Sequence, residues 1–316
     1  MTAILTVTLN PAVDVSAATV LVEPIRKLRC SDERRHPGGG GINVARVVTR
    51  LGGACRALYP AGGTPGQLLH RLLEAEGIGS DPVDVSTDTR ECFTIYEQSS
   101  GLQYRFVLPG GGLDEMDWQA CLARLAALVD GPAYVVLSGS LPANVPADTI
   151  ARMARIAKAQ GARVVLDTSG EALALALAEG VFLVKPNLGE LSRLAGRPLP
   201  EARAWERAAV EIVLAGGAEA VALTLGDQGA FLAGARFRLR AAPIAVEVAS
   251  AVGAGDCFLA GMVHRLTAGA DWREAFRYGM AAGTAALLTP GTELCRREDV
   301  ERLYAEVEIS AGAEEP

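Results

Sequence analysis

The middle of the chain alternates short apolar strands with amphipathic helices, and this alternation constrains the fold more than any other feature. The predicted elements are, in order, 114–129 (helix), 133–137 (strand), 147–160 (helix), 163–166 (strand), 170–178 (helix) and 182–184 (strand). Strands separated by helices of this length pair in parallel through right-handed crossovers. We therefore predict an α/β fold built on a mainly parallel sheet.

A predicted hairpin interrupts the alternation. Its strands, 89–97 and 102–108, flank the turn signal Ser99-Ser100-Gly101, and the earlier segment 15–36 is extended and irregular in pattern. No internal repeat, long linker or low-complexity tract divides the 316 residues. We predict one domain over residues 1–316 with a discontinuous β lid at about 15–36 and 88–109.

Charge and cysteine usage exclude several classes of protein. The formal net charge of −7 disfavours nucleic acid and anionic membrane surfaces as partners. The six cysteines are scattered without a C-x-x-C pair, which argues against a zinc knuckle or a disulfide framework and fits a reducing compartment. The N-terminus has no basic signal-peptide region, and the longest weakly polar run, 278–291, is too short to span a bilayer. We expect a cytoplasmic protein that binds neither nucleic acid nor a membrane.

The stretch SAVGAGDCFLAG at 250–261 is typical of a small-residue loop that runs into a helix. Gly253, Ala254 and Gly255 leave backbone N–H groups uncovered, and Asp256 lies at the helix start. Because a helix N-terminus carries partial positive charge and unpaired donors, it can hold a phosphoryl group in transfer, with Asp256 as a base beside it. An aspartate at this position can equally be a residue that only stabilises the helix.

Polar residues at other strand and helix ends are candidates for ligand contacts. The first predicted strand, 4–9, stops at Asn10-Pro11, and Asp14 follows where open α/β sheets line their ligand crevices. Four glycines at 38–41 precede a helix, and close approach of a ligand to bare backbone explains them. Asn43, in the first turn of that helix, offers a donor and an acceptor to a sugar hydroxyl.

Two further pairs of side chains have both a functional and a structural interpretation. Arg90 and Arg105 on the hairpin suit a phosphate, although either one alone is compatible with a solvated strand face. Asn187 and Glu190 are one helical turn apart and can hold a hydrated Mg²⁺. The same spacing also fits a capping asparagine with a capping-box glutamate.

Several motifs together resemble the PfkB/ribokinase family of sugar kinases, in the family's order and across essentially the whole chain. They are PGGGGINVAR at 37–46, LVKPNLGEL at 183–191, TLGDQGA at 224–230 and VGAGDCFLAG at 252–261. Shorter motifs narrow the resemblance to members that act on phosphorylated fructose: KLRC at 27–30, TR at 89–90, QYRFVLPG at 103–110, SGSLP at 138–142 and DTSGEAL at 167–173. The resemblance implies a ribokinase-like three-layer α/β/α sandwich with a mainly parallel central sheet and a small β lid.

The activity implied by the resemblance is ATP-dependent phosphorylation of fructose 6-phosphate at O1, which gives fructose 1,6-bisphosphate. Tagatose 6-phosphate kinase and fructose 1-phosphate kinase are alternatives within the family. A non-catalytic sugar-phosphate sensor is a remote alternative from another class. The resemblance also implies a homodimer formed through the lid.

The resemblance further implies a role for each site residue. Asp256 would be the general base, with an anion hole formed by Gly253, Ala254 and Gly255. The residues implied to bind the sugar phosphate are Asp14, Lys27, Arg29, Gly38, Gly39, Asn43, Arg90, Arg105 and Ser140, with Lys27 or Arg29 supplied by a partner's lid. Those implied to face ATP are Lys185, Asn187, Thr224, Gly226, Gly229 and Gly283.

Two cations also follow from the resemblance. Asn187 and Glu190 would order Mg²⁺ through water. The residues implied to bind K⁺, mainly through backbone oxygens, are Ser250, Val252, Ala286, Thr289, Gly291 and Glu293. The chain departs from the family at Ala251, where relatives carry a hydroxyl beside the glycine loop.

Overall fold

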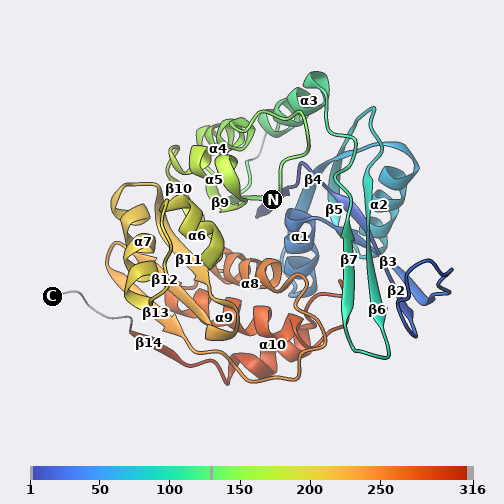
Figure 1. Ribbon diagram of the computed structural model, residues 1–316. Coiled ribbons are helices and arrows are strands. Elements are labelled where there is room, and N and C mark those ends of the chain that lie inside the picture. The colour runs from blue at the N-terminus through green and yellow to red at the C-terminus, as the bar shows by residue number, and fades with distance from the viewer. Residues whose placement is uncertain (1–2, 129–130, 312–316) are drawn as a thin grey trace.

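The computed structural model describes residues 3–128 and 131–311, and a ten-stranded sheet forms its centre (Figure 1). The strands in spatial order are β14 (Ile309–Ala311), β13 (Phe237–Ala241), β12 (Ala230–Gly234), β11 (Ala218–Thr224), β10 (Val181–Val184), β9 (Arg163–Asp167), β8 (Tyr134–Ser138), β1 (Ile4–Val7), β4 (Cys55–Ala61) and β5 (Gly79–Asp84). The seven strands from β11 to β5 run parallel, and β12, β13 and β14 extend this sheet in antiparallel pairs.

Helices cover both faces of this sheet. The helices are α1 (Gly40–Arg50), α2 (Gly63–Ala75), α3 (Glu115–Ala126), α4 (Thr149–Ala159), α5 (Gly170–Leu177), α6 (Leu188–Leu194), α7 (Ala202–Leu214), α8 (Ala254–Thr267), α9 (Trp272–Ala286) and α10 (Arg297–Tyr304). Helices α3 to α7 pack on one face, and α1, α2, α8, α9 and α10 pack on the other. This is the three-layer α/β/α sandwich expected from the resemblance.

The parallel strands are buried on both faces, so successive residues enter different cores. Ile4 belongs to the core under α1 and α8, whereas Leu5 and Val7 belong to the core under α4. Strands β8 and β10 are buried along their whole length, which explains why their sequences are continuous apolar runs.

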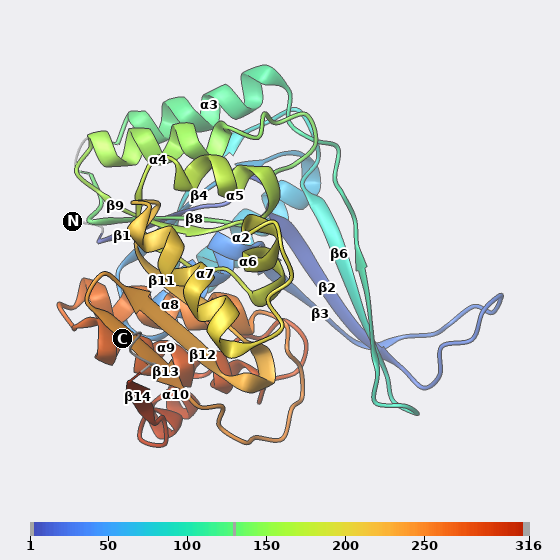
Figure 2. The same cartoon turned by 60° about the vertical axis from the view of Figure 1, so that its left-hand side comes forward.

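A separate four-stranded sheet, which we call the lid, stands beside the main body (Figure 2). Its strands in spatial order are β3 (Ser31–Gly38), β2 (Ala12–Thr19), β6 (Arg90–Glu97) and β7 (Gln103–Val107). Segment 15–36, expected to be irregular, contains most of an antiparallel pair in which Asp14 lies opposite His36. Strand β3 was not predicted because its sequence, SDERRHPG, is polar and ends in proline and glycine.

The predicted alternation is confirmed, but two parallel strands escaped prediction. Strand β4 contains Pro60, and the edge strand β5 combines Pro82 with polar residues. Proline cannot donate to a strand ladder, so such sequences read as loops. Val129, the predicted end of a helix, lies outside the described residues, and that helix ends at Ala126.

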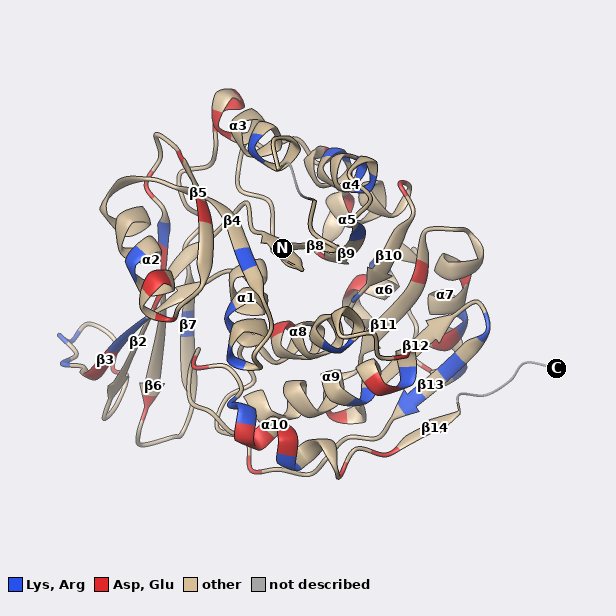
Figure 3. Ribbon diagram, turned by 180° about the vertical axis from the view of Figure 1, so that it is seen from behind, with Lys and Arg blue, Asp and Glu red and all other residues tan. Residues whose placement is uncertain are grey.

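Three further features concern the charged side chains, the cysteines and the length of the helices. Basic and acidic side chains lie next to one another on α10 and on α2 (Figure 3). All six cysteines carry free thiols. Within residues 3–128 and 131–311, no helix has the length and apolar character needed to cross a membrane.

Candidate active site

The candidate site lies at the carboxyl ends of the parallel strands, where the strand order reverses around β1. The chain leaves β1 toward β4 on one side, while β8, β9 and β10 follow on the other. Ligands of open α/β sheets bind at such reversal points. Asp167 ends β9, Lys185 follows β10, and Asp256 lies in the first turn of α8. The topology therefore gathers charged residues that are far apart in sequence.

The start of α8 is built from glycines that leave little room for a side chain. Gly253 caps the helix at φ +75°, and a Cβ there would lie 2.4 Å from Leu294. A Cβ at Gly255 would lie 3.3 Å from Lys185 Nζ. The first N–H groups of a helix have no intrahelical acceptor, so this end is left as a donor cradle next to Lys185.

Asp256 has the electrostatics of a base poised near neutral pH. Burial raises the pKa of Asp256 to about 7, and the Asp167 carboxylate reinforces this shift, while a hydrogen bond from Asn43 and the charge of Lys185 oppose it. Asn43 Nδ2 donates to Asp256 Oδ2 at 2.8 Å. A base works best when its pKa lies close to the operating pH.

Lys185 and Asp167 form an ion pair beside this base, with Nζ 3.1 Å from Oδ1. Burial of the Lys185 ammonium works to lower its pKa, but the attraction of Asp167 outweighs this, and the net pKa is raised. Lys185 is thus a permanent cation beside the predicted anion hole. Asp167 was part of a motif in the sequence but was assigned no role there, and its position one strand away from Lys185 emerges only from the pairing of β9 with β10.

The glycine run at 38–41 permits close packing within the protein, which is a reason for these glycines beyond the expected approach of a ligand. A Cβ at Gly40 would lie 2.4 Å from Ser138 Oγ, and one at Gly41 would lie 2.5 Å from Thr8 Oγ1. A Cβ at Gly38 would collide with the Asp14 carboxylate at 2.3 Å. The run therefore brings α1 onto the ends of β1 and β8.

Asp14 and Asn43 keep polar atoms available at this junction. Burial raises the pKa of Asp14, against the charges of Arg46, Arg105 and Arg90. Asn43 Oδ1 is buried and has no protein hydrogen-bond partner in the described chain. A sugar hydroxyl would satisfy this oxygen, because a buried acceptor without a partner is costly.

Arg105, Arg90 and Ser140, which are also predicted to bind the sugar phosphate, differ in how far they are already engaged in contacts within the protein. Arg105 is exposed on β7. Arg90 is already engaged, since its guanidinium donates to the carbonyls of Asn10 at 3.1 Å, Pro11 at 3.4 Å and Leu108 at 3.0 Å. Ser140 Oγ accepts from Asn10 Nδ2 at 3.2 Å at the same strand ends.

Lys27 and Arg29 are not brought to Asp14 of their own chain. They lie on the exposed segment between β2 and β3, at the far end of the lid hairpin (Figure 2). Asp14 is five residues from the end of β2, which corresponds to about 17 Å of extended strand.

A cavity of ≈ 550 Å³ opens beside the start of α8 and is lined by four of the six residues predicted to face the nucleotide, whereas Lys185 and Asn187 do not line it. Thr224, Gly226, Gly229 and Gly283 all line it, with Ala254 and Gly255 of the anion hole at one end. Its apolar walls come from Pro243, Ile244, Val246, Phe258 and Met280. Of these wall residues, only Phe258 lies within a quoted motif, and no motif marked the other four. A largely apolar cavity with few polar groups suits the planar adenine ring of a nucleotide.

Asn187 and Glu190 form the capping box that was one of their two interpretations. Glu190 N donates to Asn187 Oδ1 at 2.9 Å, and Asn187 N donates to Glu190 Oε2 at 2.9 Å. Glu190 Oε1 stays outside these two bonds. Among residues 3–128 and 131–311, no three His, Cys, Asp or Glu side chains cluster as a metal site.

The loops predicted to bind a monovalent cation meet in the structure. Ser250 Oγ donates to the Gly291 carbonyl at 3.2 Å and accepts from Val252 N at 3.2 Å. Thr289 Oγ1 donates to the Ala286 carbonyl at 3.0 Å. The Glu293 side chain pairs with Arg34 of the lid, and its carbonyl accepts a hydrogen bond from Arg50.

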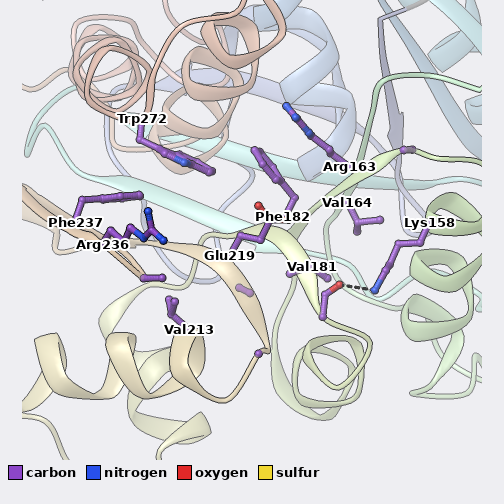
Figure 4. Close-up of a pocket in the computed structure, with 15 residues that line it drawn as sticks. Lys158, Arg163, Val164, Val181, Phe182, Val213, Glu219, Arg236, Phe237 and Trp272 are labelled. Carbon is purple, nitrogen blue, oxygen red and sulfur yellow. Dashed lines mark hydrogen bonds between the residues drawn. The ribbon is translucent and has the colours of Figure 1, made fainter.

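A second cavity, of ≈ 680 Å³, lies at the amino ends of β9, β10 and β11, away from the site (Figure 4). Trp272 stacks on Phe182 with centroids 4.9 Å apart, and Lys158 Nζ donates to the Gly180 carbonyl at 2.9 Å. None of the site residues predicted from the sequence lines this cavity.

Comparison with known proteins agrees with the geometry. Residues 6–299 match the pfkB family of carbohydrate kinases. The ATP-dependent 6-phosphofructokinase isozyme 2 of Mycobacterium tuberculosis is 43% identical over 301 residues, which are 95% of this chain and 88% of that protein. The isozyme 2 of Escherichia coli is 40% identical over 306 residues, covering 96% and 99%.

Solved structures and a more distant relative complete the comparison. The E. coli phosphofructokinase-2 structure in complex with potassium has a TM-score of 0.93, with 40% identity and coverage of 97% and 99%. Its complex with fructose-6-phosphate has a TM-score of 0.91 at 39% identity, with the same coverage. The 1-phosphofructokinase of Bacillus subtilis is 34% identical over 312 residues, covering 97% and 99%. The chain belongs to the pfkB family of carbohydrate kinases.

Proposed function

We propose that this protein phosphorylates fructose 6-phosphate at O1 with ATP. The observation that carries the proposal is the position of Asp256, a carboxylate with a pKa of about 7 on the first turn of α8. It contacts Asn43 on the sugar side and lies next to the glycines that border the nucleotide cavity. The relatives of 40% and 43% identity carry this activity in their names.

In the proposed reaction, Asp256 accepts the proton of the O1 hydroxyl as that oxygen attacks the γ-phosphorus. A bond forms from O1 to phosphorus, the bond to the bridging oxygen breaks, and ADP leaves. The N–H groups at the start of α8 and the Lys185 ammonium stabilise the charge on the transferring group. Asp14 and Asn43 orient the sugar, and Arg105 binds its phosphate.

Two cations are part of the proposal. Glu190 Oε1 would order Mg²⁺ through water, because Mg²⁺ prefers oxygen ligands and retains several waters. The ion would neutralise charge on the ATP phosphates. The loops at 250–252 and 286–293 would hold K⁺ through carbonyl oxygens, as the potassium complex of the E. coli enzyme suggests.

We also propose a homodimer through the lid. Most of the large apolar side chains exposed in the described chain lie on lid segments, namely Val20, Leu21, Ile25, Leu28, Tyr96, Leu102, Phe106, Val107 and Leu108. Exposed apolar patches of this kind mark interaction sites. A facing lid would cover them and bring Lys27 and Arg29 to the neighbouring sugar site.

A panel of sugar phosphates tests the proposed substrate. We expect coupled ADP release with fructose 6-phosphate to exceed that with tagatose 6-phosphate or fructose 1-phosphate by at least about tenfold in kcat/KM. Preference for fructose 1-phosphate would instead assign the activity of the B. subtilis relative. Binding of all three sugars without ADP release would identify a sensor.

The pH dependence of the reaction follows from Asp256. Because its ionised form accepts the proton, kcat/KM should rise with pH and level off above about 7, the pKa of Asp256. The second ionisation of the sugar phosphate itself lies near about 6. Rates measured from pH 5.5 to 9 with neutral fructose as a second acceptor separate the two, and a flat profile with both acceptors would contradict the assignment.

A further inference from the structure

Arg46 is a completely buried arginine on α1, one turn beyond Asn43. A buried guanidinium is costly unless all its donors are paired, so its surroundings show what it does. Its Nε lies 3.0 Å from both carboxylate oxygens of Glu76, and its Nη2 lies 2.8 Å from Glu76 Oε1. This fork anchors the arginine to the end of α2.

The remaining nitrogen of Arg46 joins two segments that border the site. Nη1 donates to the carbonyl of Pro37 at 3.0 Å and to that of Thr292 at 3.3 Å. Pro37 lies at the end of lid strand β3, where the lid enters the main body. Thr292 lies in the loop that also carries Gly291 and Glu293. One side chain therefore ties the base of the lid to this loop.

Neighbouring contacts strengthen the same connection. Arg50, one turn farther along α1, lies 3.2 Å from Glu76 Oε2 and also donates to the Glu293 carbonyl. The His36 ring lies 3.1 Å from Thr292 Oγ1 through Nδ1. Strand β3, α1, α2 and the loop at 289–295 thus meet around the ion pair of buried Arg46 and half-buried Glu76.

The Pro37 carbonyl that Arg46 holds is only one residue away from a contact with Asp14, which is predicted to bind the sugar. Gly38 follows Pro37, and its Cα packs so tightly against the Asp14 carboxylate that a Cβ would lie 2.3 Å from Oδ2. Movement of the Pro37 carbonyl would therefore displace the backbone on which Asp14 rests. A misplacement of about 1 Å in a reacting pair can cost 10²-fold in rate.

We propose that Arg46 is a positioning residue that sets the sugar site by fixing the base of the lid to the 289–295 loop. It does so without touching the substrate. The proposal rests on the proposed function for its kinetic readout, because it concerns the site for the sugar phosphate.

The test compares Arg46→Lys with a matched control, Arg56→Lys. Lysine keeps the charge, but its single nitrogen cannot form the two-nitrogen fork to Glu76 and at the same time reach the Pro37 and Thr292 carbonyls. Arg56 is also paired with a buried carboxylate, Asp81 at 2.7 Å, but on β4 away from the lid. We expect Arg46→Lys to raise KM for the sugar phosphate about tenfold, with KM for ATP within about twofold of wild type. Arg56→Lys should leave both constants at the wild-type values.

Hydrogen exchange provides a readout independent of substrate. Backbone amides of 31–38 and 289–295 should exchange faster in Arg46→Lys than in wild type or Arg56→Lys. Glu76→Gln, which weakens the fork from the other side, should shift both readouts in the same direction. An unchanged KM with unchanged exchange, or equal effects of both lysine variants, would overturn the proposal. If wild type phosphorylates no sugar, the proposed function fails, while the exchange pattern still decides the role of Arg46.

Discussion

Replacing Asp256 with asparagine should lower kcat by roughly 10³-fold or more while the protein folds and binds ATP. The amide cannot take the hydroxyl proton, and loss of a positioned general base typically costs about 10²–10⁴-fold. KM for ATP should stay within about threefold of wild type, because Asp256 does not line the nucleotide cavity. Steady-state ADP release and ATP binding by calorimetry measure the two effects. A near wild-type kcat would remove Asp256 from the mechanism.

The same replacement should stabilise the protein at high pH. Burial raises the pKa of Asp256 from 3.8 to about 7, so the folded state binds a proton more tightly than the unfolded state. The contribution of Asp256 to wild-type stability should therefore fall as pH rises from about 4 to about 7, whereas asparagine stays neutral. We expect Tm of Asp256→Asn to exceed that of wild type by several degrees at pH 8, and by little at pH 4. If the variant and wild type differed in Tm equally at both pH values, ionisation of buried Asp256 would not be what destabilises the wild type.

Replacing Arg105 with alanine should raise KM for fructose 6-phosphate by about 30-fold or more. Arg105 lies exposed on β7 and is one of the cations that act on Asp14. A charge-assisted contact from arginine to phosphate is worth about 2 kcal/mol or more. Phosphorylation of neutral fructose should change little, since that substrate offers no phosphate. Arg105 is preferred to Arg90 because Arg90 holds three backbone carbonyls, and its loss would also disturb the lid.

Arg236→Ala is the matched control for Arg105. Arg236 is also exposed, but it lines the cavity at the opposite edge of the sheet. Its replacement should leave both substrates unaffected. If Arg105→Ala raised KM equally for fructose and its phosphate, the arginine would be shaping the lid instead of binding phosphate.

The sequence predicts the site best where chemistry and local conformation coincide. Gly253 needs its positive φ, and Asp256 stands at a helix start, so both are visible in the motif itself. The spacing of Asn187 and Glu190 allowed either a Mg²⁺ site or a capping box, and the structure contains the capping box, which depends only on one turn of helix.

Features that depend on long-range packing were harder to predict. The glycine run suggested a ligand, but its nearest neighbours are Thr8 and Ser138, which only the assembled sheet brings there. Arg46 gives no sequence signal of burial, because two of its three partners, Glu76 and Thr292, are 30 and 246 positions away. Strands β4 and β5 contain prolines that local propensity reads as loops, and tertiary pairing overrides it.

The length of the lid hairpin has a consequence for how the enzyme must be assayed. If cations from the tip of one lid complete the sugar site of a second chain, each site exists only in the assembled pair. Specific activity would then fall as the enzyme is diluted below the dissociation constant of the pair, and sugar phosphate would restore it by linkage, because it binds only the assembled site. Binding of the substrate would thus shift the equilibrium from separate subunits toward the assembled pair.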